Sequence, residues 1–252
     1  MFGFYNGFSF RGASGGSTPY SVPCSISLNN SNTEYIDLGT NLNAILNSAT
    51  VPFALCFFLN RNTTSGTDTF LGNWTDQVLF RFDTAGTISL LFNTTGAGGT
   101  DSFTTTDTFL STSLWYHVVV VYDPSATTNA NTCKLWVNGV QRSGTYTNTL
   151  DRIQSSVNPL RIGVGNSTPF DGYINQFACI QRATVVTGTE IGDWYNSGQP
   201  VDPIELFGSA CKMHITGSDA TWNGSNFDFT DRTGNYTGIV SSGLTSGDKV
   251  CS

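Results

Sequence analysis

The stretch WYHVVVVYD at Trp115–Asp123, followed by KLWVNG at Lys134–Gly139, decides the fold of this chain. Val118–Tyr122 is a continuous run of apolar residues. A continuous apolar strand of this kind is typical of a central strand that is buried on both faces. The Asn138-Gly139 pair between two strand-like segments indicates a type I′ turn, because both central residues of that turn need positive φ. We therefore expect a long central strand at Trp115–Tyr122 and then a tight hairpin.

Short segments with alternating apolar and polar residues continue on both sides of this stretch, separated by clusters of Gly, Asn, Asp and Thr. We predict further strands at Ser25–Leu28, Tyr35–Leu38, Phe53–Asn60, Asp68–Gly72, Gln77–Asp83, Thr87–Asn93, Ser102–Thr106, Thr132–Val137, Val140–Thr145, Arg161–Val164 and Gly172–Gln181. A single clear helical pattern covers Thr187–Asn196, and Gly198 ends it. Many strands with almost no helix predict an all-β sandwich or barrel.

The composition excludes several classes of protein. The 252 residues include 11 Lys and Arg against 18 Asp and Glu, for a net charge of −7, which argues against a nucleic-acid surface. Only 12% of residues are charged, which argues against coiled coils and long exposed helices. Aromatic residues make up 13% and must be buried or used, which argues against disorder. No segment is long enough to insert into a membrane, and we expect no Sec signal at the N-terminus.

Six cysteines are scattered without the CxxC spacing of zinc sites. Cys56, Cys133 and Cys179 lie within predicted strands, so we expect them to be unbridged core residues. Free buried thiols are the general expectation in the absence of an export signal. A Cys211–Cys251 bridge stays open as an alternative if the protein matures outside a cell.

The pattern divides the chain into three segments. Residues 1–22 form a Gly-rich arm, residues 23–198 carry the regular strands, and residues 199–252 form an extension with few aliphatic residues. The aromatic residues of the arm are Phe2, Phe4, Tyr5, Phe8 and Phe10. Because exposed aromatic residues are costly in water, we expect an assembly arm that docks on a neighbouring subunit, with its own domain as the alternative.

The extension cannot build a core alone. We predict its strands at Lys212–Thr216, Phe227–Thr230 and Gly238–Val240, packed on the sandwich or on a partner.

Seven stretches resemble, in chain order, a known family. They are EYIDLG (Glu34–Gly39), FALCFFLN (Phe53–Asn60), WYHVVVVYD, KLWVNG, LRIG (Leu160–Gly163), FDGYINQFAC (Phe170–Cys179) and TEIGDWYNSG (Thr189–Gly198). The family is that of laminin-G-like, concanavalin A-like jelly-roll domains, in the branch found in bacterial surface proteins and bacteriophage virion proteins. The resemblance covers about residues 25–198. It implies a jelly-roll β-sandwich with the short helix packed across an open end.

The sequence predicts no catalytic residues. Related β-glucanases carry two glutamates on one strand in an ExDxE pattern, because retaining hydrolysis needs two carboxylates close together. The only glutamates here are Glu34, Glu190 and Glu205, and they are far apart in sequence. His117 lies inside the central strand, where a core histidine is the simpler interpretation. We therefore expect a protein that is not an enzyme.

The family resemblance also implies a structural Ca²⁺ site. The closing strand of such domains usually reads GxIDE, whereas here Gly172–Gln176 reads GYINQ and Asn175 replaces the acid. Asn175 together with Asp37, Asp123 and Asp171 forms the candidate ligand set. The alternative is that Asp123 and Asp171 are ordinary turn residues.

Glycan binding is the common recognition role of the family. It would use exposed aromatic rings that stack on sugars, with amide and carboxylate partners. Trp74 in LGNWTD and Trp222 in ATWNGSN are the candidate residues. The alternative for each is a loop anchor packed on its own core.

These observations favour a non-enzymatic structural protein of a virus particle, a capsid- or tail-associated subunit of a tailed phage assembled in the host cytoplasm. Its expected partners are other virion proteins and copies of itself, with host glycans facing the jelly roll, and no nucleic acid. The alternative is a glycan-binding module of a bacterial surface or secreted protein.

Overall fold

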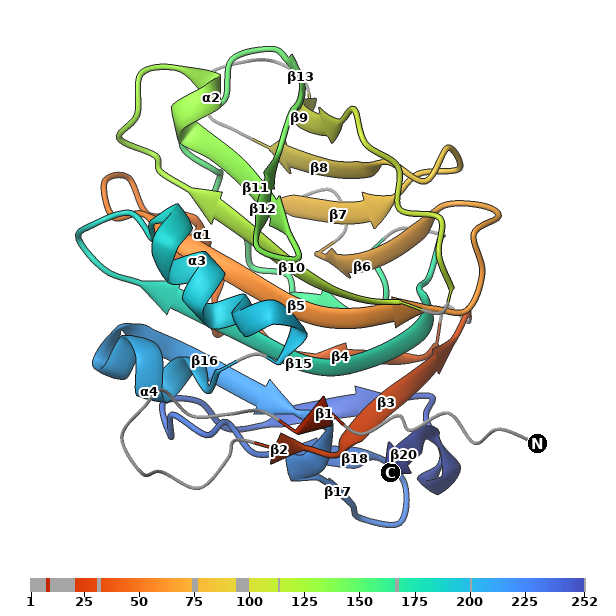
Figure 1. Cartoon of the computed structure of the whole chain (residues 1–252). Coiled ribbons are helices and arrows are strands. Elements are labelled where there is room, and N and C mark those ends of the chain that lie inside the picture. Colours follow the sequence, from red (N-terminus) through yellow and green to blue (C-terminus); the bar gives the residue numbers. More distant parts are fainter. Residues whose placement is uncertain are drawn as a thin grey trace.

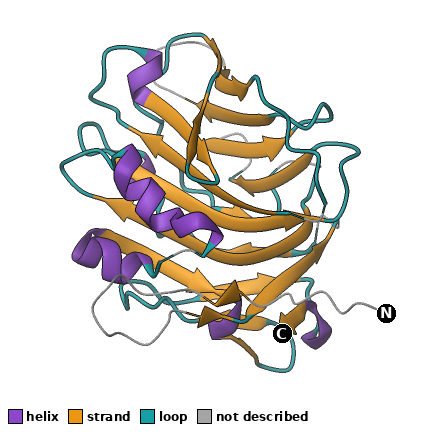
Figure 2. Cartoon of the chain, viewed as in Figure 1, coloured by secondary structure: helices purple, strands orange, loops and turns teal. Residues whose placement is uncertain are grey.

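Two antiparallel sheets stack face to face in the computed structural model (Figure 1 and Figure 2). The structure describes residues 8–9, 21–30, 33–73, 77–93, 100–112, 114–165, 168–199 and 201–251. Over these residues strands dominate and helices are few, which confirms the predicted all-β sandwich.

The first sheet has eight strands. In spatial order they are β12 (Val140–Arg142), β11 (Cys133–Val137), β10 (Trp115–Tyr122), β5 (Phe53–Arg61), β15 (Asp171–Gln181), β3 (Cys24–Asn29) and β20 (Lys249–Cys251), with β16 (Cys211–Thr216) also on β15. The first half of β15 pairs with β3 and its second half pairs with β16. The two strands thus share one edge of β15.

The second sheet has ten strands. In spatial order they are β13 (Gly144–Thr147), β9 (Thr100–Thr105), β8 (Ile88–Asn93), β7 (Val78–Phe82), β6 (Asp68–Gly72), β14 (Arg161–Ile162), β4 (Tyr35–Asp37), β19 (Ile239–Ser242), β18 (Phe227–Phe229) and β17 (Ala220–Trp222). Its inward residues are mainly apolar and form the main core with the inward residues of the first sheet.

Strand β10 is buried on both faces, as its sequence predicts. Val118 and Val120 point into the core between the sheets, whereas Val119 and Val121 belong to a second apolar cluster on the outer side. The hairpin that follows turns at Asn138 and Gly139, with φ of 54° and 74°. Both predictions from the opening stretch are confirmed.

Helices α3 (Gly188–Tyr195) and α4 (Pro203–Phe207) pack on the outer side of the eight-stranded sheet, and Figure 1 shows α3 lying over β10 and β5. Ile191 and Trp194 of α3 reach the second cluster, and the rings of Trp194 and Phe207 are 5.0 Å apart. The expectation that the helix closes an open end of the sandwich is therefore wrong. The physical reason is that β10 and β5 carry apolar residues on their outer side, which α3 covers.

The start of α3 follows from a capping box. The backbone N–H of Glu190 donates to the Thr187 hydroxyl, and the Glu190 carboxylate accepts from the Thr187 backbone N–H. The remaining helical pieces are short: α1 (Asn43–Leu46), α2 (Asn129–Thr132), η1 (Asn196–Gly198), η2 (Gly208–Ala210), η3 (Gly217–Asp219) and η4 (Ser246–Asp248). No helix of the described residues is long and apolar enough to cross a membrane.

The C-terminal extension contributes strands to both sheets. Strand β16 pairs with β15, β19 pairs with β4, and β20 pairs with β3. The register of β20 places Cys251 directly opposite Cys24, and the two form a disulfide. The alternative of a Cys211–Cys251 bridge is therefore wrong, because Cys211 is buried on β16 as a free thiol. The remaining cysteines, Cys56, Cys133 and Cys179, are unbridged and buried, as expected.

Most of the N-terminal arm lies outside the described residues. Within the arm the structure describes the backbone of β1 (Phe8–Ser9) and β2 (Ser21–Val22), and these two strands pair with each other. Phe2, Phe4, Tyr5 and Phe10 lie outside the described residues. The assembly-arm hypothesis stays a prediction.

Candidate functional site

The outer side of the ten-stranded sheet carries a row of side chains in cross-strand register. Neighbours along the strands, such as Ile36 and Ile162, are buried in the main core, so the residues between them point away from it. The row runs from strand to strand through Leu91, Leu79, Gly72, Arg161, Asp37, Val240, Asp228 and Thr221.

A hollow of about 280 Å³ opens in this surface beside Arg161. Its lining residues are Gly72, Asn73, Asn158, Pro159, Arg161, Val164 and Gly165. A Cβ added to Gly72 would lie 2.7 Å from the Cα of Gly165, and one added to Gly165 would lie 2.6 Å from Leu79 Cδ1. The wall therefore depends on two glycines, because only they let these two backbone segments pack together.

Arg161 is held from two sides at the edge of the hollow. Its Nε donates to Asp37 Oδ2 at 3.2 Å, and its guanidinium carbon lies 4.4 Å from the centre of the Tyr35 ring. Its side chain is 38% exposed. The two terminal NH₂ groups have no partner within the described part of the chain, so they are available to a ligand.

Asp37 completes a donor–acceptor pair with Arg161. Its Oδ1 accepts from the backbone N–H of Gly39 at 2.8 Å, which fixes the carboxylate to its own loop. Its side chain remains 24% exposed. Because Asp37 and Arg161 are direct cross-strand partners on β4 and β14, the sheet itself sets their relative position.

A second hollow of about 660 Å³ lies at the rim of the sandwich. Leu110 and Leu114 are 51% and 53% exposed there. Its arginine, Arg142, bonds Asp107 at 3.3 Å and the carbonyl of Val137 at 3.1 Å. The rim therefore exposes two leucines among polar groups, and Arg142 already has hydrogen-bond partners.

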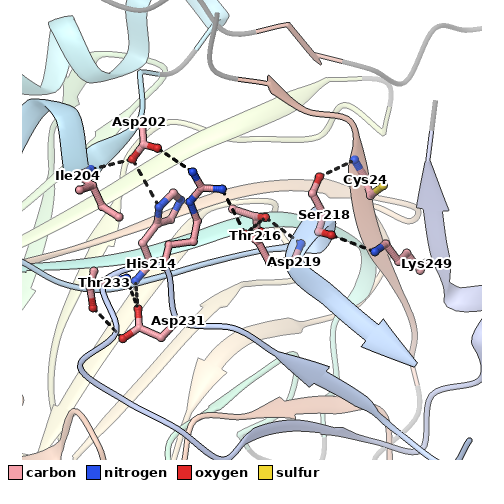
Figure 3. Close-up of polar contacts among 11 residues, drawn as sticks. Cys24, Asp202, Ile204, His214, Thr216, Ser218, Asp219, Asp231, Thr233 and Lys249 are labelled. Atoms are coloured by element: carbon pink, nitrogen blue, oxygen red, sulfur yellow. Dashed lines mark hydrogen bonds and ion pairs between the residues drawn. The ribbon is translucent and has the colours of Figure 1, made fainter. Parts of the chain in front are cut away.

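The C-terminal extension also contains a cluster of charged residues (Figure 3). Asp202 accepts from the backbone N–H of Ile204 at 2.8 Å and pairs with Arg232 at 3.2 Å, and Arg232 also reaches Asp219 at 3.5 Å. Burial, with Arg232 nearby, lowers the pKa of His214 to about 3. His214 is therefore neutral near pH 7, and its 3.6 Å contact with Asp202 is not an ion pair. The cluster therefore joins the start of α4 to η3 and to the turn that contains Arg232.

Asp231 anchors the loop between β18 and β19 in the same region (Figure 3). Its buried carboxylate accepts backbone N–H groups from His214, Thr233, Asn235 and Tyr236, and also the Thr233 hydroxyl. A carboxylate surrounded by donors in this way stabilises the fold. We assign it a structural role.

The candidate Ca²⁺ ligands make separate contacts. Asp37 pairs with Arg161, and Asp171 accepts from the side-chain amide of Asn62 at 2.9 Å. Asp123 accepts the backbone N–H and the hydroxyl of Ser125, which makes it a turn residue.

Asn175, the fourth candidate, occupies a bulge in β15 and donates its side-chain amide to the main-chain carbonyls of Val22 and Cys24. Over the described ranges no group of three His, Cys, Asp or Glu is arranged to hold a metal. These contacts do not fit a shared cage of oxygen ligands.

The two tryptophan candidates differ. Trp222 is partly buried against the main core, with its ring 5.2 Å from that of Phe227 in an edge-on contact. This arrangement favours the alternative of an anchor. Trp74 lies outside the described residues, although Asn73, which precedes it in the sequence, lines the hollow.

The glutamates lie on different elements. Glu34 accepts from the backbone N–H of Asn29 at 2.7 Å, and Glu205 is exposed on α4. Hydrogen bonds, chiefly from Arg182, lower the pKa of Glu190 to about 2. Glu34 and Glu190 are thus held by local structural bonds.

Sequence reasoning placed Arg161 in a strand without giving it a role. The signal that was available is its position between Leu160 and Ile162, which are both core residues. A charged residue at that position must face outward. Its pairing with Asp37, 124 residues away, could not be seen from local sequence.

Comparisons with known proteins agree with this fold. The family model described as the concanavalin A-like lectin/glucanases superfamily matches residues 30–191. No protein among the curated ones matches the chain. A Bacteroides ovatus protein whose proposed role is carbohydrate binding is similar in structure, with 17% identity and a TM-score of 0.56. The alignment covers 90% of this chain and 59% of that one.

A second similar structure is the CBM40 domain of the Ruminococcus gnavus IT-sialidase bound to α2,3-sialyllactose. It has 15% identity, a TM-score of 0.49, and coverage of 68% of this chain and 97% of that one.

Proposed function

Because this chain belongs to the concanavalin A-like lectin/glucanases superfamily, we propose that it binds carbohydrate on the outer side of its ten-stranded sheet, in the hollow beside Arg161. We also propose that it does so without catalysis. None of the residues that line the hollow belongs to the main core.

The observation that carries the proposal is the pair of NH₂ groups on Arg161, which have no partner among the described residues and lie at the edge of a preformed hollow. Sugars present many hydroxyl groups, so their sites need fixed donors and acceptors with little reorganisation. Arg161 supplies donors, Asp37 supplies an acceptor, and both are fixed by the sheet register. Pro159 and Val164 add apolar surface that can contact the ring carbons of a sugar.

The arrangement of the two sheets supports the choice of face. Helices α3 and α4 cover the outer side of the eight-stranded sheet, whereas the row through Arg161 and Asp37 faces outward from the other sheet. The Bacteroides ovatus protein points in the same direction through its proposed role, although this chain spans only 59% of its length.

The absence of enzyme activity remains a proposal. It rests on Glu34 and Glu190, which are held by local structural bonds, and on His117, which is buried. Retaining hydrolysis needs two neighbouring carboxylates with different protonation states, and these glutamates lie on separate elements.

The viral hypothesis gains no support from the fold or the comparisons. It depends on the aromatic arm, and Phe2, Phe4, Tyr5 and Phe10 lie outside the described residues. A location in a virion, with virion proteins and copies of this chain as partners, therefore stays a hypothesis. The findings favour the alternative of a glycan-binding module, and the Cys24–Cys251 disulfide fits a protein that works outside a reducing compartment.

A glycan array probed with the whole chain tests the proposed function, followed by calorimetry on the best glycan. We expect Arg161→Ala to weaken binding about 10- to 100-fold, the equivalent of one or two charge-assisted hydrogen bonds. Arg81→Ala is the matched control, because Arg81 projects from β7 of the same sheet and pairs with Asp83 at 2.8 Å but does not line the hollow. Binding to no glycan, or equal binding by both variants, would reject the proposal.

A further inference from the structure

We infer that the glycan held beside Arg161 is a neutral sugar that presents two adjacent hydroxyl groups to the Arg161–Asp37 pair. This inference rests on the proposed function and specifies the class of ligand. It depends on three features of the same surface: the compensated charge, the geometry of the pair and the shape of the hollow.

The charge at the hollow is compensated. The Arg161 guanidinium lies 3.2 Å from the Asp37 carboxylate, so an approaching anion meets a negative group together with the positive one. Along the outward row, Asp228 adds a further carboxylate, which accepts from the Asn223 amide. The whole chain has a net charge of −7, which repels polyanions at long range. A neutral ligand avoids both penalties.

The geometry of the pair suits two neighbouring hydroxyl groups. The terminal NH₂ groups of Arg161 form a planar fork that donates to two oxygen atoms side by side. Each hydroxyl oxygen can accept one of these bonds and still donate its own hydrogen. The exposed part of the Asp37 carboxylate lies beside the fork and can accept such a hydrogen. A ligand carboxylate has no hydrogen to give and would face Asp37 instead.

The hollow is small. Its volume of about 280 Å³ is close to the lower end, ~300 Å³, of sites that hold small molecules, which suits a single sugar ring or a chain end. Gly72 and Gly165 form its narrow wall, and a methyl group at either position would collide with the other segment. The pair and the wall together select for a compact, uncharged ring.

The test uses calorimetry with two oligosaccharide series of equal length, one neutral and one containing uronic acids, at low and high NaCl. We expect the neutral series to bind with less than a two-fold change between the two salt concentrations, because uncharged ligands are not screened. Asp37→Asn and Arg161→Lys each keep most of the side-chain volume and should weaken neutral binding at least ten-fold. A neutral glycan in which the adjacent hydroxyl groups are methylated should also lose binding.

Thermal unfolding of each variant shows whether it is folded, and Arg81→Ala serves again as the control. Binding of the acidic series alone, weakened by salt and strengthened by Asp37→Asn, would overturn the inference but leave carbohydrate binding at this site in place. Binding of neutral glycans that ignores Arg161→Lys and Asp37→Asn would also overturn it. Binding of neither series, together with an empty glycan array, would instead reject the proposed function.

Discussion

His117 makes the stability of this protein dependent on pH between pH 7 and pH 5, which lies above the range where most carboxylates titrate. The imidazole is fully buried on the outer side of β10, with its Nε2 3.2 Å from Cys56 Sγ. The rings of Trp194 and Tyr195 lie 5.6 and 5.7 Å away. Burial lowers the pKa of His117 to about 3, so the folded protein keeps it neutral.

The size of the effect follows from proton linkage. In the unfolded chain the pKa of a histidine is about 6.5, so between pH 6.5 and about 3 the unfolded state binds a proton that the folded state does not. Stability therefore falls as the pH is lowered through this range. From pH 7 to pH 5 the loss is about 2 kcal/mol for His117, a large share of a typical total of about 5–15 kcal/mol.

The measurement is urea unfolding at pH 7, 6 and 5 for the natural chain and for His117→Gln. The variant changes the absolute stability, so the quantity to compare is the loss between pH 7 and pH 5. We expect this loss to be smaller by about 2 kcal/mol in the variant. Other groups titrate alike in both proteins and cancel, including His214, which faces Asp202 and Arg232. Equal losses in the two proteins, or an NMR titration of His117 above pH 5, would refute the reasoning.

Three further predictions concern stability and the disulfide. Asp231→Ala should cost about 4 kcal/mol in a denaturant titration, because it leaves several buried donors unpaired, whereas Asp228→Ala on the exposed side of β18 should cost less than about 1 kcal/mol. A thiol titration of denatured, unreduced protein should give four thiols, since Cys24 and Cys251 are joined, and a count of six would contradict the bridge. Glu190→Gln should lower the free energy of unfolding by about 1 kcal/mol at pH 7 and leave it unchanged near pH 2. The ionised Glu190 carboxylate stabilises the fold above a pH of about 4.3, and this contribution is lost as the pH falls toward 2. An unchanged melting temperature at pH 7 would contradict the prediction.

The strands could be predicted because their signals are local. Strand β10 begins and ends at the predicted residues, and the Asn138-Gly139 turn has the positive φ values that this pair favours. Helix α3 starts after Thr187 because Thr187 and Glu190, three residues apart, form a capping box. Such features depend on alternation, turn chemistry or capping, and each is contained within a short segment.

The features that were missed depend on contacts between distant segments. The Cys24–Cys251 bridge joins residues 227 apart and needs the pairing of β20 with β3, for which the sequence carries no local signal. Asn175 was assigned as a calcium ligand by its place in a motif. In the structure its side chain lies at a bulge and its amide nitrogen donates to two main-chain carbonyls. Motif position alone did not reveal which bond the side chain makes.

The candidate site shows how non-local pairing creates chemistry from ordinary residues. Strand β14 is only two residues long, yet it pairs with β6 on one side and β4 on the other. That double pairing places Arg161 between Gly72, which has no side chain, and Asp37, which compensates its charge. A larger residue at position 72 would fill the space beside the guanidinium, and a neutral residue at position 37 would leave a bare cation. The hollow and the preference for uncharged ligands that we propose for it would therefore both follow from the register, and we expect substitutions at Arg161 and Asp37 to alter affinity and charge selectivity together.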